Sequence, residues 1–308
     1  MQRTTTSLAA PCDLTIVILT LNEELHIERC IQSLQGVAIR IVVVDSYSTD
    51  RTCELAICAG AEVIHHKFLN HASQFNWALD NAEISSTWVM KLDADETLTP
   101  SLVKALRIAF ATALPEHTGY TINLGRIFLG KFLRYGALYP IRLLRIWRAG
   151  FGRIENRWMD EHVIVDGAIN HIDADFYDHN LNNITWWTQK HNQYATREAI
   201  EFLMNKDRID VPGNTHAMNV DARVKRWIKR TIYARLPLGL RAFLYFLYRY
   251  FLRLGFLDGR QGLIFHFLQG FWYRFLVDVK IQELKFSMKK GGLTLAQVVR
   301  EEYGFEID

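Results

Sequence analysis

The chain has 308 residues, of which 49% are hydrophobic, and a formal net charge of +3. This length suits one large domain, or a domain with an appendage, and it provides a sizeable core. So small a net charge does not by itself indicate a nucleic-acid partner. The four cysteines form no CxxC pair, which is typical of reduced thiols in a cytosolic protein. Residues 1–11 lack a basic segment and a long apolar segment, so we expect no signal peptide.

Short apolar runs alternate with helical patterns along the first half of the chain. The strands predicted from β-branched runs cover residues 14–20, 39–44, 61–65 and 88–92. The predicted helices cover residues 22–34, 51–59, 70–82 and 101–114. This alternation predicts parallel βαβ units in a doubly wound sheet. Apolar segments at 117–128 and 138–147 are expected to add strands and to make the sheet mixed.

Polar residues follow three of the predicted strands, namely Asn22, Asp45 and the pair Asp93 and Asp95. The carboxyl ends of parallel strands lie at one edge of a sheet, so these residues are expected to converge on one crevice. Two acids separated by one residue can hold a hard divalent cation that substrate phosphates share. The ordinary alternative is that Asp93 opens a turn and Asp95 caps the next helix, with Pro100 in its first turn.

The turn after the first predicted strand contains no glycine; it reads Thr20-Leu21-Asn22-Glu23. A dinucleotide site would show G-x-G-x-x-G at this place, and the chain has no P-loop either. The sequence therefore disfavours a nicotinamide dehydrogenase and a nucleoside-triphosphate hydrolase.

Four motifs follow one another between residues 14 and 96. They read Thr-Leu-Asn-Glu-Glu, Val-Val-Asp-Ser-Tyr-Ser-Thr-Asp-Arg-Thr, Ser-Gln-Phe-Asn-Trp-Ala-Leu and Leu-Asp-Ala-Asp-Glu. In this order they resemble the inverting glycosyltransferases of family 2, which have the GT-A fold. The resemblance implies a UDP-sugar as donor substrate and a divalent metal, Mn or Mg, as cofactor.

The resemblance also assigns roles to single residues. Those expected at the nucleotide and donor sugar are Thr20, Asn22, Glu23, Asp45, Gln74, Asn76, Asp93 and Lys190. Asp95 is expected to ligate the metal beside the diphosphate, together with Asp93. Each residue also has an ordinary interpretation. The same side chains occur in turns, in the first turn of a helix, where an acid favours the helix dipole, and on the solvated face of a helix.

Consecutive acids beside an aromatic residue are found at Trp158-Met159-Asp160-Glu161-His162. A carboxylate in a partly dry cleft suits a general base, because burial raises its pKa. Alignment with relatives that carry His-Glu here makes Glu161 the expected base and Asp160 the second candidate. An acid-rich loop without catalytic function is the alternative.

The composition changes after residue 212. Residues 223–260 contain ten basic residues against one acid, interleaved with aromatic and aliphatic side chains. Arg241, Arg249 and Arg253 share one helical face opposite an apolar face, which is typical of a helix lying in a bilayer interface. The three arginines argue against a spanning helix. A second apolar helix at 263–277 would complete a hairpin, and a helix pair buried in a homo-oligomer is the alternative.

These patterns together predict a GT-A catalytic domain at residues 1–212 and a helical membrane-docking or oligomerisation region at 213–308. The expected reaction moves a sugar, with inversion, from a UDP-sugar to a lipid-linked glycan, either lipopolysaccharide core or a polyprenyl-diphosphate saccharide. The expected location is the cytoplasmic face of the inner membrane, as a peripheral or monotopic protein on an anionic surface and without a nucleic-acid partner. A non-catalytic nucleotide-sugar-binding scaffold and a metal-dependent nucleotidyltransferase are the rival hypotheses.

Overall fold

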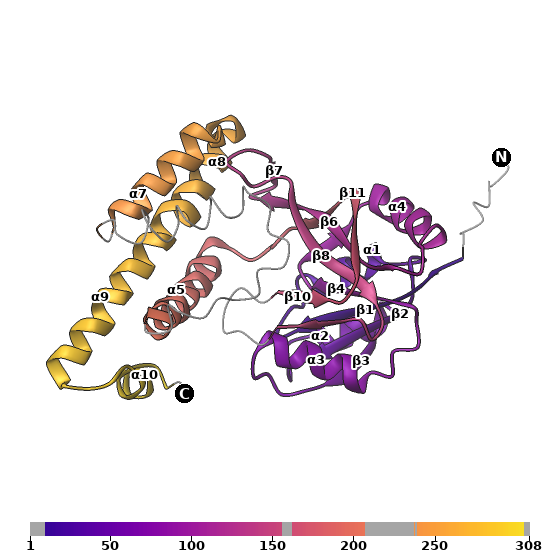
Figure 1. Cartoon of the computed structure of the whole chain (residues 1–308), viewed down its shortest axis with the longest axis horizontal. Helices are drawn as coiled ribbons and strands as arrows, with labels where there is room; N and C mark the ends of the chain where they lie inside the picture. The colour runs from indigo at the N-terminus through magenta and orange to yellow at the C-terminus, as the bar shows by residue number, and fades with distance from the viewer. Residues whose placement is uncertain (1–9, 156–161, 207–236, 238, 305–308) are drawn as a thin grey trace. The chain divides into compact units, whose positions relative to one another are not determined.

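The computed structural model describes residues 10–155, 162–206, 237 and 239–304. The chain divides into two compact units (Figure 1). The N-terminal unit contains residues 1–134 and 138–182, and the C-terminal unit contains residues 135–137 and 183–308. The domain boundary predicted at residue 212 lies outside the described residues.

The N-terminal unit is built on one mixed sheet. Its strands are β1 (Cys12–Thr20), β2 (Ala38–Asp45), β3 (Glu62–His65), β4 (Trp88–Asp93), β5 (Glu96–Leu98), β6 (His117–Phe128), β7 (Lys131–Leu133), β8 (Ile141–Arg148) and β11 (Ala168–Asp178). Their order is β3-β2-β1-β4-β8-β6-β11-β5, and β7 pairs with β6. The strands β3, β2, β1 and β4 are parallel, whereas β8 runs antiparallel to both β4 and β6. A separate two-stranded sheet joins β9 (Gly152–Ile154) and β10 (Val163–Val165).

Helices cover both faces of this sheet because its central strands are apolar on both sides. The helices are α1 (Ile27–Ser33), α2 (Thr52–Cys58), α3 (His71–Asn81) and α4 (Pro100–Ala111). In β1, Ile16 and Ile18 belong to the cluster that includes α1, α2 and α4, and Val17 belongs to the cluster that includes α3. This alternation is what buries a strand on both faces. The predicted α/β class with a doubly wound mixed sheet is confirmed.

The first helix begins later than predicted, at Ile27 instead of residue 22. Asn22 has a left-handed φ of 56°, and its side chain accepts a hydrogen bond from Thr49 N at 2.9 Å. These contacts hold the chain in a turn after β1, so a helical pattern in the sequence does not become a helix there.

Asp95 does not cap a helix, so the ordinary alternative for this residue is wrong. The N-cap of α4 is Thr99, whose hydroxyl accepts from Leu102 N at 3.2 Å, and Pro100 is the first residue of the helix. Asp95 instead lies in the two-residue turn between β4 and β5.

The C-terminal unit is helical. Its elements are α5 (Ile184–Lys206), α7 (Leu240–Leu247), the π-helical turn η2 (Tyr248–Leu252), the 3-10 turn η3 (Gly255–Asp258), α8 (Gly259–Phe265), the π-helical segment η4 (His266–Trp272), α9 (Tyr273–Gly291) and α10 (Leu295–Tyr303). Its core joins α5, α9 and α10 through side chains such as Ile200, Ile281 and Val299. The segment 240–252 folds back beside η4 and α9 as a helical hairpin (Figure 1).

The arginines predicted to form a basic face of this hairpin do not all point outward. Arg241 and Arg249 are each only 6% exposed and point into the hairpin, whereas Arg253 is exposed. Arg241 pairs with Asp278, and Arg249 Nε donates to the carbonyl of Gly136 at 3.0 Å. None of the helices among the described residues has both the length and the apolar character needed to cross a membrane.

Candidate active site

The register of the parallel strands brings the predicted polar residues to one edge of the sheet. Thr20 at the end of β1 is aligned with Asp45 at the end of β2, and Leu19 is aligned with Asp93 at the end of β4. Adjacent strands lie about 4.8 Å apart, so the ends of β2 and β4 are separated by about 10 Å. The residues that follow β1, β2 and β4 therefore form a single strand-edge cluster at the carboxyl ends.

Asp45 is a buried carboxylate surrounded by donors. Its oxygens accept from the hydroxyl of Thr20 at 2.9 Å, from Ser48 N at 2.7 Å and from Ser48 Oγ at 2.5 Å. Burial alone would raise the pKa of Asp45, but these hydrogen bonds outweigh it and lower the pKa. The buried Gln74 braces the same loop, since its Nε2 donates to Ser46 Oγ at 2.6 Å.

The turn after β1 is fastened to the loop after β2. Asn22 N donates to Ser48 Oγ at 2.8 Å, and Glu23 N donates to Thr52 Oγ1 at 2.7 Å. The carboxylate of Glu23 faces His26 Nδ1 at 2.7 Å. Asn22 and Glu23 thus shape the strand-edge cluster through both backbone and side chain.

Asp93 is held between two cations. Its Oδ1 accepts from Lys91 Nζ at 2.7 Å and its Oδ2 from Arg145 at 3.1 Å. Arg145 also pairs with the buried Glu96 at 2.6 Å, and Glu96 accepts from Asp93 N at 2.8 Å. Desolvation would raise the pKa of Asp93, but the charges of Lys91 and Arg145 hold it well below its usual range. Asp93 therefore stays ionised with its charge compensated by the protein.

Asp95 lies two residues further on and is half-buried. Its Oδ2 accepts from Asn180 Nδ2 at 2.9 Å, and its carbonyl accepts from His179 N at 3.1 Å. Arg29 of α1 donates to the carbonyl of His179 at 2.6 Å and so fixes this segment after β11. The turn that carries Asp95 is thereby supported from two other elements.

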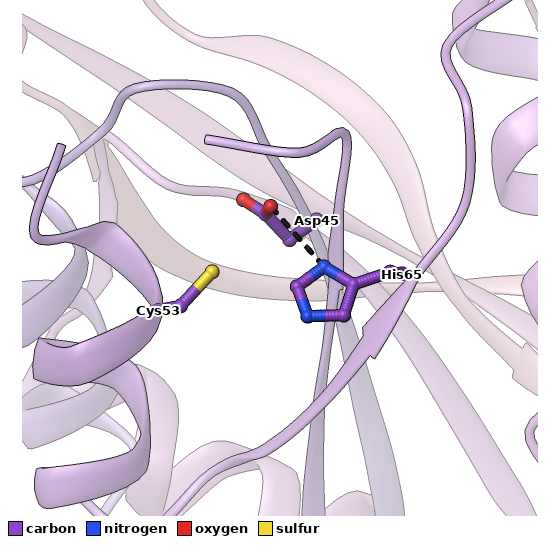
Figure 2. Close-up of side chains that lie close together, drawn as sticks. All are labelled: Asp45, Cys53 and His65. Carbon is purple, nitrogen blue, oxygen red and sulfur yellow. Dashed lines mark ion pairs between the residues drawn. The ribbon is translucent and has the colours of Figure 1, made fainter. Parts of the chain in front are cut away.

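His65 and Cys53 approach Asp45 from β3 and α2 (Figure 2). His65 Nδ1 lies 3.5 Å from Asp45 Oδ2, and one ligand atom of each of the three residues lies within 4.8 Å of the others. Burial and the neighbouring Asp45 charge raise the pKa of Cys53 to about 11, so the thiol stays protonated. A cysteine binds a metal as the thiolate, so the three residues are better described as a hydrogen-bonded carboxylate than as a metal site. The Tyr47 ring is stacked on His65 with centroids 5.5 Å apart.

Two further predicted residues, Asn76 and Lys190, have other surroundings. Asn76 uses both polar atoms of its side chain on the backbone of Ile154, at 2.8 and 3.0 Å. Lys190 belongs to the C-terminal unit, where its Nζ lies 4.6 Å from the centroid of the Trp186 ring. Asp160 and Glu161 lie outside the described residues.

A family model matches part of the N-terminal unit. The model of the glycosyl transferase family 2 matches residues 15–146, which include β1 and the turn with Asp95. The chain contains a family 2 glycosyltransferase domain.

Two proteins similar to the chain are named glycosyltransferases. An uncharacterized glycosyltransferase of Rickettsia typhi is 26% identical over 276 residues, which are 88% of this chain and 87% of that protein. The lipopolysaccharide core biosynthesis glycosyltransferase LpsC of Rhizobium meliloti is 32% identical over 162 residues, which are 51% of this chain and 58% of LpsC. Among solved structures, glucosyl-3-phosphoglycerate synthase from Mycobacterium tuberculosis, in complex with Mn²⁺, UDP and glucosyl-3-phosphoglycerate, is 26% identical with a TM-score of 0.31. The match covers 36% of this chain and 43% of that one.

The family 2 domain implies a divalent cation, and the donor set at the strand edge fits one. Asp95 offers a half-buried carboxylate at the turn after β4, and carboxylate oxygens are what Mg²⁺ and Mn²⁺ prefer. The charge of Asp93 is compensated by Lys91 and Arg145, whereas Asp95 Oδ2 accepts from Asn180.

Sequence reasoning missed several residues of this cluster. Glu96 directly follows Asp95, and its burial gives no periodic signal in so short a strand. Lys91 precedes Asp93 by two residues. Because side chains two residues apart in a strand lie on the same face, the sequence could have identified Lys91 as a neighbour of Asp93. His65 ends β3, and its nearness to Asp45 follows from the parallel pairing of β2 with β3.

Proposed function

We propose that the family 2 domain transfers a sugar from a UDP-sugar to a lipid-linked saccharide, with inversion at the anomeric carbon. The observation that carries the proposal is the convergence of Thr20, Asp45, Asp93 and Asp95 at one edge of the parallel strands. Ligands of open α/β sheets bind at this edge.

The two ends of the strand-edge cluster suit the two ends of a nucleotide diphosphate. At the β2 end, the base or ribose would lie against the exposed Tyr47 ring, which is stacked on His65, and the buried Asp45 would hold the loop that carries Tyr47. At the β4 end, Asp95 would hold the cation beside the diphosphate. The cation, when bound, supplies positive charge that stabilises the leaving diphosphate.

Inverting transfer needs one general base. The acceptor hydroxyl attacks the anomeric carbon from the side opposite the diphosphate, the bond to the diphosphate oxygen breaks, and UDP departs. In this proposal the carboxylate of Glu161 takes the hydroxyl proton, with Asp160 as the second candidate.

The acceptor we favour is a glycan carried on a lipid, either lipopolysaccharide core or a polyprenyl-diphosphate saccharide. The similarity to LpsC, whose name states lipopolysaccharide core biosynthesis, supports the first of these. With such an acceptor, the proposed place of the reaction is the cytoplasmic face of the inner membrane.

The test is a panel of UDP-sugars incubated with the chain, Mn²⁺ and a crude bacterial lipid extract, with products analysed by mass spectrometry. The proposal expects UDP and a lipid product heavier by one sugar residue. Release of diphosphate would indicate a nucleotidyltransferase instead. UDP-sugar binding without any product would indicate a non-catalytic scaffold.

A further inference from the structure

The helical hairpin of the C-terminal unit buries several charged side chains and exposes many apolar side chains. In a helical hairpin surrounded by water the distribution is the opposite, since charged residues are rarely buried and apolar faces point to the core. We propose that this surface inserts into the headgroup and upper acyl region of an anionic lipid bilayer. The inference uses the C-terminal unit alone and does not need the reaction proposed above.

Buried polar contacts lie inside the hairpin, beside buried apolar side chains such as Phe265 and Val277. Arg241 Nε donates to Asp278 Oδ1 at 2.6 Å, and Asp278 also accepts from Gly239 N at 2.7 Å. At the other end, Asp258 accepts from Tyr135 N at 2.9 Å. All three charged side chains are less than 9% exposed. Charged side chains within apolar surroundings are typically paired in this way and turned from the lipid.

The outer surface of the hairpin is apolar over its whole length. The exposed large hydrophobic residues between positions 239 and 279 are Leu240, Phe243, Leu244, Tyr248, Phe251, Leu252, Leu254, Phe256, Leu257, Leu263, Phe267, Phe275 and Val279. Leu252, at the tip, is 76% exposed. Exposed apolar side chains in this number mark a membrane or protein contact.

The charges that remain exposed favour lipid as the partner. Within residues 239–279, which are all described, the exposed charged residues are Arg253 and Arg260, and both are cationic. Arg253 lies within the apolar tip 251–257 and Arg260 lies just after it, where both would be at the level of lipid phosphates. Basic residues near an anionic leaflet each favour binding.

The backbone of the tip is also suited to an apolar medium, where every polar group needs an internal partner. Leu254 N donates to Phe251 O at 3.2 Å, and Leu257 N donates to Leu254 O at 3.0 Å. The carbonyl of Arg253 accepts from Gly136 N at 2.8 Å. Since no described helix can span a bilayer, shallow insertion of the tip is the mode that fits.

Flotation of the full chain with vesicles tests the inference. Wild-type protein should float with vesicles of equal parts phosphatidylglycerol and phosphatidylcholine. The double variant Leu252→Glu/Phe256→Glu should bind them at least tenfold more weakly, because two charges would enter the apolar layer. Ile108→Glu is the matched control, since Ile108 is 66% exposed on α4 of the other unit, and it should float like wild type.

A further variant, tested on anionic and on neutral vesicles, measures how much the exposed positive charge contributes to binding. Arg260→Gln should weaken binding to the anionic vesicles by about fivefold and leave binding to pure phosphatidylcholine unchanged. Because Leu252, Phe256 and Arg260 are exposed, their replacement should leave the melting temperature unchanged, and circular dichroism checks this.

Three results would overturn the inference. The wild-type chain could fail to float with the vesicles, or the tip variants could float like wild type. In the third case, the tip variants would convert an oligomer to a monomer in sedimentation velocity. The last result would assign the surface to a second copy of the chain. Mn²⁺-dependent UDP binding, measured on the same samples, reports on the proposed function separately, so a floating chain that binds no UDP refutes only that function.

Discussion

Arg145 is the buried cation on which two carboxylates of the strand-edge cluster depend. It contacts Asp93 at 3.1 Å and Glu96 at 2.6 Å, and its own side chain is 10% exposed. Arg145→Met should lower the free energy of unfolding by about 3 to 5 kcal/mol, because removing one partner of a buried ion pair leaves uncompensated charge. Urea denaturation measures this. Arg142→Met, on the exposed side of the same strand, is the control and should change stability by less than about 0.5 kcal/mol. Equal stability of the two variants would contradict the assigned role of Arg145.

Glu161 carries the proposed proton transfer. Glu161→Gln should reduce turnover by about 100-fold or more and leave the dissociation constant for the UDP-sugar unchanged, because the amide cannot accept the proton. Steady-state kinetics and calorimetry on the same preparation check both values. Asp160→Asn is the companion variant. If Glu161→Gln is fully active and Asp160→Asn is not, the base is Asp160.

At the scale of residues, the sequence predicted positions better than partners. Asp45 and Asp93 were placed correctly at strand ends because each directly follows a β-branched apolar run. The partners of Asp93 were not predictable as a set. Arg145 is 52 residues away and reaches it only because β8 pairs with β4.

At the scale of elements, hydrogen bonds in the folded chain decided which part of a helical sequence pattern became a helix. The pattern from residue 22 is helical in sequence, but hydrogen bonds from the turn to Ser48 and Thr49 delay the helix to Ile27. In the hairpin, periodicity correctly placed Arg241 and Arg249 on one face. It could not tell whether that face points outward, because this depends on Asp278 and Gly136, which are far apart in the sequence.

His266 gives the hairpin a pH dependence. The residue is fully buried between Gly136 and Gly255, where a Cβ atom at either glycine would overlap its ring. Burial, and then the charge of Arg249, lower the pKa of His266 to about 4. The unfolded chain binds a proton near pH 6.5 and the folded chain does not, so stability is full above that pH and falls as the pH drops toward 4.

Urea unfolding at pH 7 and pH 5, followed by the helical signal, measures this effect. Wild type should lose about 2 kcal/mol from this group between the two pH values. His266→Gln should lack this loss, whereas replacement of the exposed His162 by Gln should keep it. A His266→Gln variant with the pH dependence of wild type would show that another group is responsible.

At the scale of the whole molecule, the parallel half of the sheet was the predictable half. The strands β1 to β4 come in βαβ order, and their connections follow general rules of handedness and adjacency. The other half joins β8, β6, β11 and β5, which are not in sequence order, so no local pattern could give their pairing. The segment after β11 that supports Asp95 belongs to this half.

In the proposed reaction, a nucleotide diphosphate and a cation meet at the turn after β4. Isothermal titration calorimetry of UDP, with and without Mn²⁺, on wild type, Asp95→Asn and Asp166→Asn tests this most directly. Asp166 is an exposed acid of the same unit and serves as the control. We expect Mn²⁺ to strengthen UDP binding to wild type and to Asp166→Asn, and to have no effect on Asp95→Asn. An Asp95→Asn variant that binds UDP with the same Mn²⁺-dependent affinity as wild type would contradict the account.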